Sequence, residues 1–511
     1  MQRFSGDGGE PEASAHTDLF VRNLLAARPA PALRFELPEL RYPLRLNAAV
    51  ALLASEMGDR PALIADATHL SRQALAERVA RLADVLVRGL GLRPGNRLIV
   101  HGQADAWAIA AVLAGWRAGA IVVCTAPGQG AAPLGHAARS TRASHALADI
   151  RHAETLLHAH APELHAVATW GDGTIEQECA RADPTAPACD TAADDPALIV
   201  IGGDGDAFVH LHRDLLSVCD SYARHVLGAD QSDRFVSPLP LAAPAGLCAN
   251  LLFPLRCGAS VILPAQAGNA ALLQAIEAHR ASIAIAAPAH FHAIAPHAEP
   301  AARLRAAVAA GDLLHAATRA AWHATTQTRL IDGLCSAALL GMFAGDEPAT
   351  GGPVRATPGH VVRLAEDGAL LVQGPTGART LAGSPPLRGG WTCAAAHAAI
   401  DATGHVTLLP AADDAPSHAV EALLMAHPSV EDCGVTTIRV GERTITEAHV
   451  VLRAEAPGTR ATAEALRRHA APCALDAIVF VEALPRSSAG RLLRTTLSDA
   501  ALHEAAEEGR G

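Results

Sequence analysis

Short apolar runs alternate with amphipathic helical segments through most of this chain. Residues 62–66, 96–101 and 120–124 read as strands, and residues 105–118 have a helical pattern. A further helix is predicted after Ser71, a favourable N-cap, because apolar residues then recur at helical spacing. These residues are Leu75, Val79, Leu82 and Leu86. Strands that alternate with helices predict an α/β fold built on doubly wound parallel sheets.

The pattern changes twice toward the C-terminus. From about residue 350 it becomes short alternating runs, which predict a small β subdomain. A polar break at Asp413 and Asp414 then precedes a short α+β tail. A chain of 511 residues is too long for one ordinary core. We therefore expect an N-terminal domain over residues 1–412 and a small C-terminal domain over residues 415–511.

Charge and hydropathy exclude several classes of partner. The net charge is −11 and no block of basic residues occurs, which argues against nucleic acid. The first residues contain no apolar run of the kind found in secretory signals, and Arg, Asp or His interrupts each longer apolar run. We therefore expect a cytoplasmic protein that binds neither nucleic acid nor membranes.

Cysteine and histidine give little sign of a metal site. The ten cysteines are scattered and form no CxxC pair, so we interpret them as buried thiols. The pairs His210/His212 and His290/His292 would each place two rings on one face of a strand. Neither pair has an obvious carboxylate or thiolate to complete a coordination set. No metal site is predicted.

A glycine-rich turn follows the apolar run 197–201, and a helix-like segment follows the turn. This order predicts a strand, a turn and a helix, in which backbone N–H groups and a helix N-terminus would face an anion. However, Asp204 and Asp206 stand where a phosphate-binding loop has Lys and hydroxyl groups. A plain turn and a working phosphate site both remain open. The glycines are Gly202, Gly203 and Gly205.

The C-terminal tail carries the most informative motif. The segment LPRSSAGRLLRTTL at 484–497 resembles the C-terminal signature of adenylate-forming enzymes, the superfamily of acyl-CoA and aryl-CoA ligases, luciferases and nonribosomal adenylation domains. Other segments are then most similar to the benzoate and 2-aminobenzoate CoA ligases. These segments are residues 35–53, 89–102, 210–227, 237–260 and 331–343.

The resemblance implies a reaction and its cofactors. Such ligases join a carboxylic acid to ATP with Mg²⁺, release pyrophosphate, and pass the acyl group to CoA. ATP, Mg²⁺ and CoA are implied here by resemblance alone, since the residues themselves predict no cofactor. Positive charge and hydrogen-bond donors are needed wherever phosphate charge shifts.

At most of the family's motif positions, this chain lacks the polar or charged side chain that the family has. The glycine-rich turn occupies the place of the phosphate loop but is shorter and lacks its hydroxyls and Lys. The family's Thr-Glu pair aligns with Ala337 and Ala338, and its ribose-binding Asp aligns with Ala396. The Arg expected before the hinge aligns with Ala411, and the catalytic Lys of the tail is Arg491. Together these changes remove most of the electrostatic machinery for adenylation.

Other segments resemble the family but lack the residues that contact the substrate and CoA. The substrate pocket of the family would be lined here by Ala243, Gly246 and Gly311, without its aromatic residues, or be filled by Leu247 and Cys248. By resemblance, Asp413 and Asp414 correspond to the family's hinge, which implies that the small C-terminal domain is mobile. After this hinge, the CoA-receiving loop of the family is reduced to residues 415–418.

Two retained features can be interpreted in more than one way. Asp332 and Gly333 either contact adenine through the backbone or form a turn at the end of a strand. Arg486, Arg491 and Arg494 either face an anion or form a solvated face.

Three functions follow from these residues. The first is a ligase fold that no longer adenylates and that binds or scaffolds a protein partner, such as an active ligase or a carrier protein. The second is an active but divergent ligase for an aromatic or acyl acid. The third is a sensor that binds an aryl acid or acyl-CoA without turnover.

Overall fold

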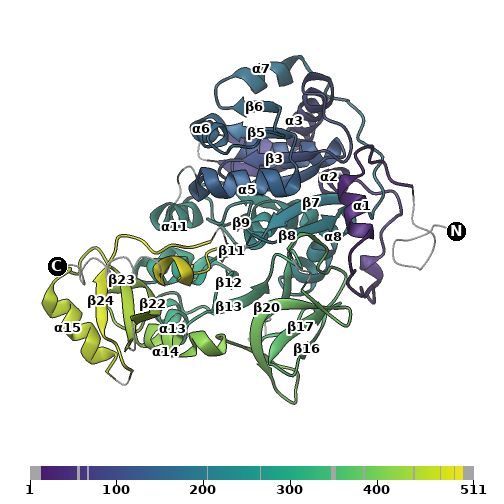
Figure 1. The fold of residues 1–511 in the computed structure, drawn as a ribbon. Coiled ribbons are helices and arrows are strands. Elements are labelled where there is room, and N and C mark those ends of the chain that lie inside the picture. Colours follow the sequence, from purple (N-terminus) through teal and green to yellow (C-terminus); the bar gives the residue numbers. More distant parts are fainter. Residues whose placement is uncertain are drawn as a thin grey trace.

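The structure is a computed structural model of the chain. It describes residues 13–54, 58–65, 68–203, 205–264, 266, 268–346, 353–383, 386–440, 443–471, 473–487 and 489–498. Most of these residues belong to two large sheets, a small β subdomain and a small C-terminal domain (Figure 1). The predicted α/β fold class is therefore correct.

The first large sheet has seven strands in the order β18-β8-β7-β4-β3-β5-β6. From β7 to β6 neighbouring strands are parallel, while β8 and β18 run antiparallel at one edge. The strands are β3 (Arg97–His101), β4 (Ile121–Thr125), β5 (His145–Asp149), β6 (Ala166–Trp170), β7 (Pro196–Ile201), β8 (Ala207–Leu211) and β18 (Thr380–Ala382).

The second large sheet has nine strands in the order β15-β14-β13-β12-β11-β9-β10-β1-β2. Its six central strands are parallel, and antiparallel strands lie at both edges. The strands are β1 (Pro61–Ala65), β2 (Thr68–Ser71), β9 (Arg234–Val236), β10 (Ser260–Ile262), β11 (Ile283–Ala286), β12 (Ala306–Ala310), β13 (Leu330–Cys335), β14 (Met342–Gly345) and β15 (Arg355–Ala356).

A layer of helices lies between the two sheets and shares one apolar core with both. Alternate side chains of a strand point to opposite faces, so Leu98 and Val100 of β3 enter this core from one sheet, and Ile283 and Ile285 of β11 enter it from the other. Trp116 is fully buried here and donates its indole N–H to the Ala197 carbonyl at 2.8 Å. The layer comprises α2 (Ala48–Leu53), α3 (Arg72–Asp84), α4 (Ala106–Arg117), α8 (His212–Val218), α9 (Pro244–Leu247) and α10 (Phe253–Cys257).

The caps of two core helices show why they begin where they do. Ser71 accepts a hydrogen bond from the N–H of Ala74 at the start of α3, as the sequence predicts. Asp105 accepts hydrogen bonds from the N–H groups of Trp107 and Ala108 at the start of α4. Both helices therefore begin at a side chain that satisfies their free N–H groups.

Further helices cover the outer faces of the sheets. Ile99 and Val123 pack outward with helices of the N-terminal third, and Ala284 and Ala286 pack outward on the other sheet. The outer helices on the first sheet are α1 (Phe20–Ala26), α5 (Ala131–Thr141) and α6 (Ala153–Leu157). Those on the second are α11 (Asn269–Ala278), α12 (Pro288–Ile294) and α13 (Ala316–Thr326). A further helix, α7 (Thr174–Arg181), packs its buried residues against α3. The large domain is thus a five-layer arrangement of helices and sheets.

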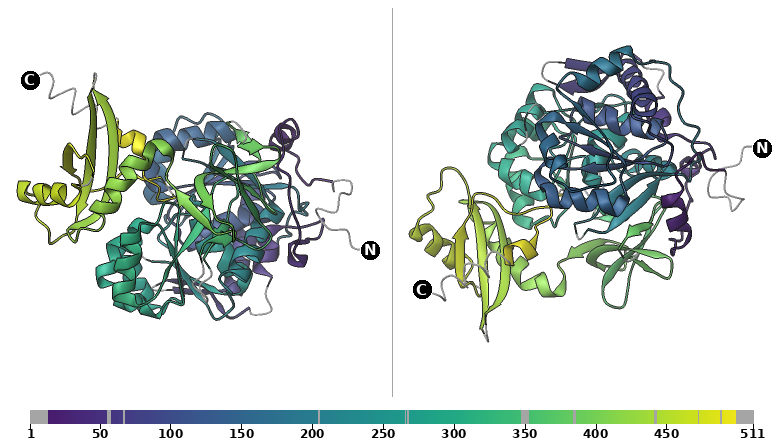
Figure 2. Two further views of the ribbon diagram at one scale, coloured as in Figure 1. Left: turned by 90° about the horizontal axis from the view of Figure 1, so that it is seen from below. Right: turned by 45° about the horizontal axis from the view of Figure 1, so that its top comes forward.

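Two smaller units follow in the chain, and Figure 2 shows both beside the large sheets. The β subdomain is a five-stranded antiparallel sheet. Its strands are β16 (Val361–Leu364), β17 (Ala369–Gln373), β19 (Leu387–Arg388), β20 (Trp391–Ile400) and β21 (Val406–Leu409). The C-terminal domain contains β22 (Val430–Val440), β23 (Arg443–Leu452), β24 (Ala477–Phe480), α14 (Ala415–Leu424) and α15 (Arg460–His469).

Hydrogen bonds join the C-terminal domain to the large domain. The Arg453 guanidinium donates to the carbonyls of His292 and Ala293 at 3.1 and 3.2 Å. Arg486 reaches Asp312 at 3.2 Å. Within the described part of the chain, no helix is both long and apolar enough to cross a membrane.

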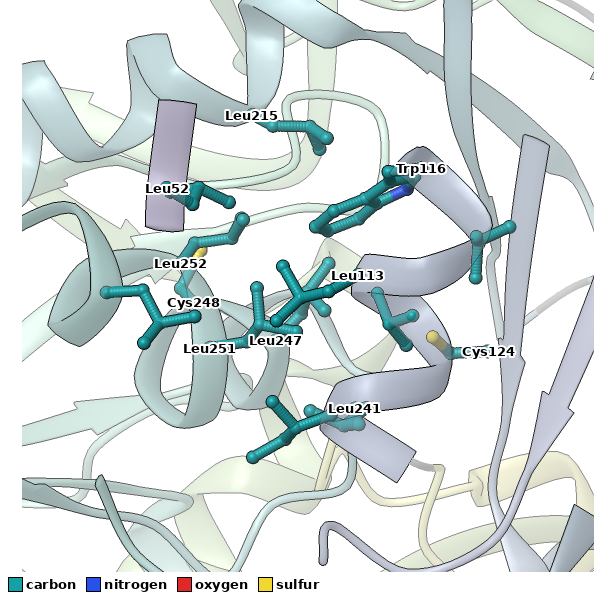
Figure 3. Close-up of a cluster of buried hydrophobic side chains, with 14 of the residues drawn as sticks. Leu52, Leu113, Trp116, Cys124, Leu215, Leu241, Leu247, Cys248, Leu251 and Leu252 are labelled. Carbon is teal, nitrogen blue, oxygen red and sulfur yellow. The ribbon is translucent and has the colours of Figure 1, made fainter. Parts of the chain in front are cut away.

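The shared core gives a direct test of how the sheets are held together. Leu113 is fully buried and points toward Leu247 and Trp116 (Figure 3). Because Leu113→Ala leaves a cavity between tightly packed elements, we expect it to lower the free energy of unfolding by about 2–5 kcal/mol. Leu157→Ala, at a side chain that is 78% exposed, is the matched control and should change it by less than about 0.5 kcal/mol. Chemical denaturation measures both; similar losses would contradict this account of the core.

Candidate functional site

The glycine-rich turn is the tip of a β-hairpin. β7 and β8 pair antiparallel, with Val200 opposite Phe208 and Ile201 opposite Ala207. The N–H of Gly202 donates to the Asp206 carbonyl at 2.7 Å. The predicted order of strand, turn and helix is therefore wrong, because β8 intervenes and α8 begins only at His212. The N-terminus of α8 therefore does not follow the turn directly.

The surroundings of the turn are crowded by backbone and carboxylate groups. The N–H of Gly205 donates to the Gly202 carbonyl at 3.1 Å, and the Gly205 carbonyl lies 3.2 Å from Nε2 of His136. A Cβ atom added to Gly383 would lie 1.6 Å from Oδ1 of Asp206, so this carboxylate packs against the loop after β18. Gly203 lies near Ser487 of the C-terminal tail, and Asp204 lies outside the described residues.

Ala337 and Ala338 lie directly against this hairpin. Nε2 of His210, on β8, donates a hydrogen bond to the Ala337 carbonyl at 2.8 Å. Ala338 is 4% exposed and packs with Phe208 and Ala378. The structure therefore brings the hairpin and the Ala337–Ala338 segment together, while their correspondence to the family's phosphate loop and Thr-Glu pair stays a prediction. Only methyl groups stand at the second position.

Asp332 and Gly333 lie inside β13, so their interpretation as a turn at the end of a strand is wrong. Gly333 pairs with Ala310, and an added Cβ would meet Val308 Cγ1 at 2.7 Å, which shows that close packing requires glycine here. Burial raises the pKa of Asp332 to about 6, and the Arg319 guanidinium, with which it forms an ion pair, opposes this shift. Contact with adenine stays a prediction.

The tail signature forms a loop against the end of β12. The N–H of Ser487 donates to the Arg491 carbonyl at 2.8 Å, and the Arg491 side chain is exposed. Gly311 has φ +99°, and an added Cβ would lie 2.1 Å from the Ala489 carbonyl oxygen. The loop thus covers Gly311, which was predicted to line the substrate pocket, and places Arg491 at the same end of the molecule as the hairpin.

The other tail arginines are held in ion pairs. Arg486 bonds Asp432 and Asp312, and Arg494 bonds both carboxylate oxygens of Glu421 at 2.7 and 2.9 Å. Both guanidinium groups are largely buried. The interpretation of these two residues as a solvated face is therefore wrong, while Arg491 does face solvent.

The predicted substrate pocket is part of the packed core. Ala243 is fully buried before α9, and an added Cβ at Gly246 would lie 2.1 Å from the Pro240 carbonyl oxygen. Leu247 and Cys248 are also buried, and Figure 3 shows both within the central cluster. Of the two alternatives for this segment, filling by Leu247 and Cys248 is the one that the structure supports.

A separate cavity of about 260 Å³ lies where the carboxyl ends of β3 and β4 meet those of β9 and β10. Ligands of open α/β sheets bind at such carboxyl ends. The sequence signal was the cluster of prolines and glycines after these strands, which was not interpreted as a cavity. The polar lining residues are Gln103, Ser237 and Gln266, and the apolar ones include Pro127, Pro238, Pro240, Pro264 and Leu272.

The remaining predicted positions lie near the domain boundary. Ala396 lies on β20 between Cys393 and His397, where the pairing with β17 shifts register. The Ala411 carbonyl accepts a hydrogen bond from the N–H of Asp414 at 2.9 Å. Asp413 is exposed, and Asp414 Oδ1 lies 3.7 Å from Nε of Arg494. The hinge at Asp413 and Asp414 stays a prediction.

The histidines of the pairs His210/His212 and His290/His292 pack inside the protein. Nδ1 of His212 accepts a hydrogen bond from the N–H of Ala48 at 3.2 Å, and Nδ1 of His292 lies 3.1 Å from Thr318 Oγ1. Burial lowers the pKa of His212 to about 3, and those of His290 and His292 to about 4. These histidines therefore stay neutral in the core.

Thiol chemistry is also disfavoured. All ten cysteines are free, and five of them are buried. Burial raises the pKa of Cys335, on β13, to about 11 and that of Cys124, on β4, to about 12. The reactive thiolate form is thus disfavoured at both positions.

Comparison with known proteins places this arrangement in a family. Residues 51–381, more than half of the chain, match the family of AMP-binding enzymes. The chain belongs to this family. It is 26% identical to the benzoate–CoA ligase of Thauera aromatica over 522 aligned residues, which cover 91% of this chain and 98% of that protein.

Solved structures show that the fold of AMP-binding enzymes extends over nearly the whole chain. An anthranilate CoA ligase in complex with anthranoyl-AMP superposes with a TM-score of 0.83 at 22% identity, covering 91% of this chain and 99% of that one. A benzoate CoA ligase from Burkholderia xenovorans LB400 gives a TM-score of 0.77 at 24% identity, covering 89% and 100%. The fold therefore has the large N-terminal and smaller C-terminal domains of adenylate-forming enzymes.

The buried contact between His210 and Ala337 predicts a pH effect. Burial lowers the pKa of His210 to about 4, below the value near 6.5 that histidine has in an unfolded chain. The unfolded state therefore binds this proton first, and stability present above pH 6.5 is lost as the pH falls toward 4. His210→Gln keeps an N–H donor without titrating, so we expect it to reduce the slope of unfolding free energy by up to about 1.4 kcal/mol per pH unit in this window.

Urea unfolding at several pH values measures this slope. His136→Gln is the matched control, because it removes an exposed histidine that contacts the same hairpin. An equal change of slope in the two variants would contradict the assignment of the effect to the burial of His210.

Proposed function

We propose that this chain keeps the adenylate-forming scaffold but has lost, or greatly weakened, ATP-dependent adenylation. It would act in the cytoplasm as a binding or scaffolding partner of an active ligase or a carrier protein. One observation carries the proposal: the hairpin that replaces the phosphate loop lies against Ala337 and Ala338, which offer neither a hydroxyl nor a carboxylate.

Charge at the hairpin supports this proposal. A triphosphate needs cations and donors, whereas the turn contains two aspartates and no basic residue. Two unit charges 4 Å apart near a protein surface interact by about 4 kcal/mol. Replacing an attractive lysine with a repulsive carboxylate therefore works against triphosphate binding.

The composition of the whole sequence points the same way. All 41 basic residues counted as Lys plus Arg are arginines, and the sequence contains no lysine. No other position of these 511 residues can then supply the lysines of the phosphate loop and the tail signature. Arg491 offers a planar, delocalised charge in place of a compact ammonium on a flexible stem.

Packing at Ala338 indicates that the site has changed beyond its motif residues. Ala338 is buried beside Phe208 and Ala378. A glutamate at this position would place a carboxylate in an apolar contact, which is costly unless the charge is paired. The surroundings of the metal-binding position of the family have therefore adapted to a methyl group.

Two features favour the other candidate functions. The tail loop against Gly311 holds Arg491 near the hairpin, which favours a divergent ligase that still adenylates an aromatic or acyl acid. The cavity of about 260 Å³ favours a sensor for an aryl acid or acyl-CoA. Neither feature supplies the missing groups for phosphate and metal.

Pyrophosphate exchange separates these functions. We expect the purified full chain to show no acid-dependent exchange of labelled pyrophosphate into ATP with Mg²⁺, because the phosphate and metal contacts are absent. Benzoate, 2-aminobenzoate, salicylate and short acyl acids form the panel, and an active benzoate–CoA ligase is the positive control. Exchange above the no-acid background would show that the chain is an active ligase.

A restored variant tests whether only the motifs have decayed. In Ala337→Thr/Ala338→Glu/Arg491→Lys we expect no recovery of exchange and a lower midpoint of thermal unfolding, because the new carboxylate is buried against Phe208. The matched control is Arg491→Lys alone, which changes an exposed side chain. Exchange in the triple variant would contradict the argument that the surrounding packing has also changed.

A further inference from the structure

Two histidines and a glutamate meet where the C-terminal domain contacts the large domain. His315 directly precedes α13, while His418 and Glu421 lie one turn apart on α14. One nitrogen from each histidine and one carboxylate oxygen lie within 4.8 Å of one another. Figure 1 shows α13 and α14 side by side, and the two imidazole rings are 6.0 Å apart. No metal site was predicted from the sequence, in which His315 lies about 100 residues from His418 and Glu421.

We propose that His315, His418 and Glu421 bind one Zn²⁺ ion that links the two domains. Two imidazoles and one carboxylate form a ligand set that zinc accepts, with the fourth position left to water. The ligands come from both domains, so the ion would hold the C-terminal domain in the orientation seen here. This site is separate from the hairpin and does not depend on whether adenylation is lost.

The distances within the cluster suit zinc. Nδ1 of His418 lies 3.0 Å from Oε2 of Glu421. Two ligands bound tetrahedrally to one zinc ion at about 2.0–2.1 Å are about 3.3 Å apart. Nδ1 of His418 is buried, and apart from this ion-pair contact with Glu421 it has no hydrogen-bond partner in the described part of the chain. This nitrogen and this oxygen are therefore spaced as two ligands of one ion would be.

Space and charge at the junction also favour a cation. A cavity of about 30 Å³ is lined by all three residues, which is room for one water molecule or one ion. Three carboxylates and two guanidinium groups line it, so these side-chain charges sum to −1. These groups are Asp312, Glu421, Asp432, Arg486 and Arg494.

Arg494 is the group with which zinc must compete. Its Nη2 atom lies 3.1 Å from Nε2 of His418 and 2.9 Å from Oε2 of Glu421. Zinc binding would require Arg494 to give up the contact with His418. Its Nη1 atom could keep its bonds to the Val435 carbonyl and to Oε1 of Glu421, both at 2.7 Å. Removing the guanidinium should therefore strengthen zinc binding.

Zinc binding to the full chain tests this site. After chelator treatment and dialysis against micromolar ZnCl₂, we expect one tightly bound zinc per chain by elemental analysis, and visible absorption typical of tetrahedral Co²⁺ after cobalt loading. His315→Ala and His418→Ala should each weaken zinc binding by more than about 100-fold, since loss of a group that merely supports a ligand already costs 10–100-fold. His315 makes no capping hydrogen bond to α13, so its loss should not unfold the helix.

The matched control is His427→Ala/His469→Ala. These two rings form another close pair, 5.2 Å apart, in the same domain. The control should keep the zinc stoichiometry and affinity of the unchanged chain. Absence of stoichiometric zinc in the unchanged chain, or equal loss in the control, would overturn the proposal.

Arg494→Gln provides a second, opposite expectation. Removal of the competing cation should tighten zinc binding by about tenfold or more, provided that circular dichroism shows a folded C-terminal domain. If this variant unfolds, the His315→Ala and control measurements still decide the proposal. A folded Arg494→Gln protein that binds zinc more weakly would contradict the assigned position of the ion.

Discussion

The structure depends on the apolar helical layer that both large sheets share. Helices α3, α4 and α8 bury side chains against both sheets at once, and Trp116 additionally bonds the carbonyl of Ala197 on β7. Because the layer fixes the two sheets relative to each other, the β7–β8 hairpin of one meets the segment after β13 of the other. The hydrogen bond from His210 to the Ala337 carbonyl joins the two sheets at the candidate site. A chain that lost its catalytic groups would keep this geometry as long as it kept the core.

Under the proposed function, the chain keeps the fold of the family but not the charged side chains that adenylation needs. The resemblance to adenylate-forming enzymes assigns the hairpin, the Ala337–Ala338 segment and the tail loop on Gly311 to catalytic positions. The side chains at those positions are methyl groups, carboxylates and one exposed guanidinium. Burial of Ala338 against Phe208 shows that the neighbourhood packs around the smaller residue. Scaffolds tolerate such changes because stability depends on the core, whereas catalysis depends on a few polar groups.

The sequence predicted most of the fold because its signals are local. Strand runs and the Ser71 cap were correct, since period and capping act over a few residues. Strand β8 was missed because its residues continue into a helix-like segment, and only pairing with β7 distinguishes them. The filling of the Gly246 region and the approach of His315 to His418 depend on tertiary packing. Such contacts between distant residues leave no local pattern to read.

Direct binding of ATP tests the central claim most closely. Equilibrium dialysis of the full chain against labelled ATP with excess Mg²⁺ reports the occupied fraction without requiring turnover. We predict no saturable binding up to millimolar ATP, because the proposed function places aspartates at the phosphate loop and alanine at the metal-binding position. Saturable binding of about one ATP per chain at micromolar concentration would contradict the account.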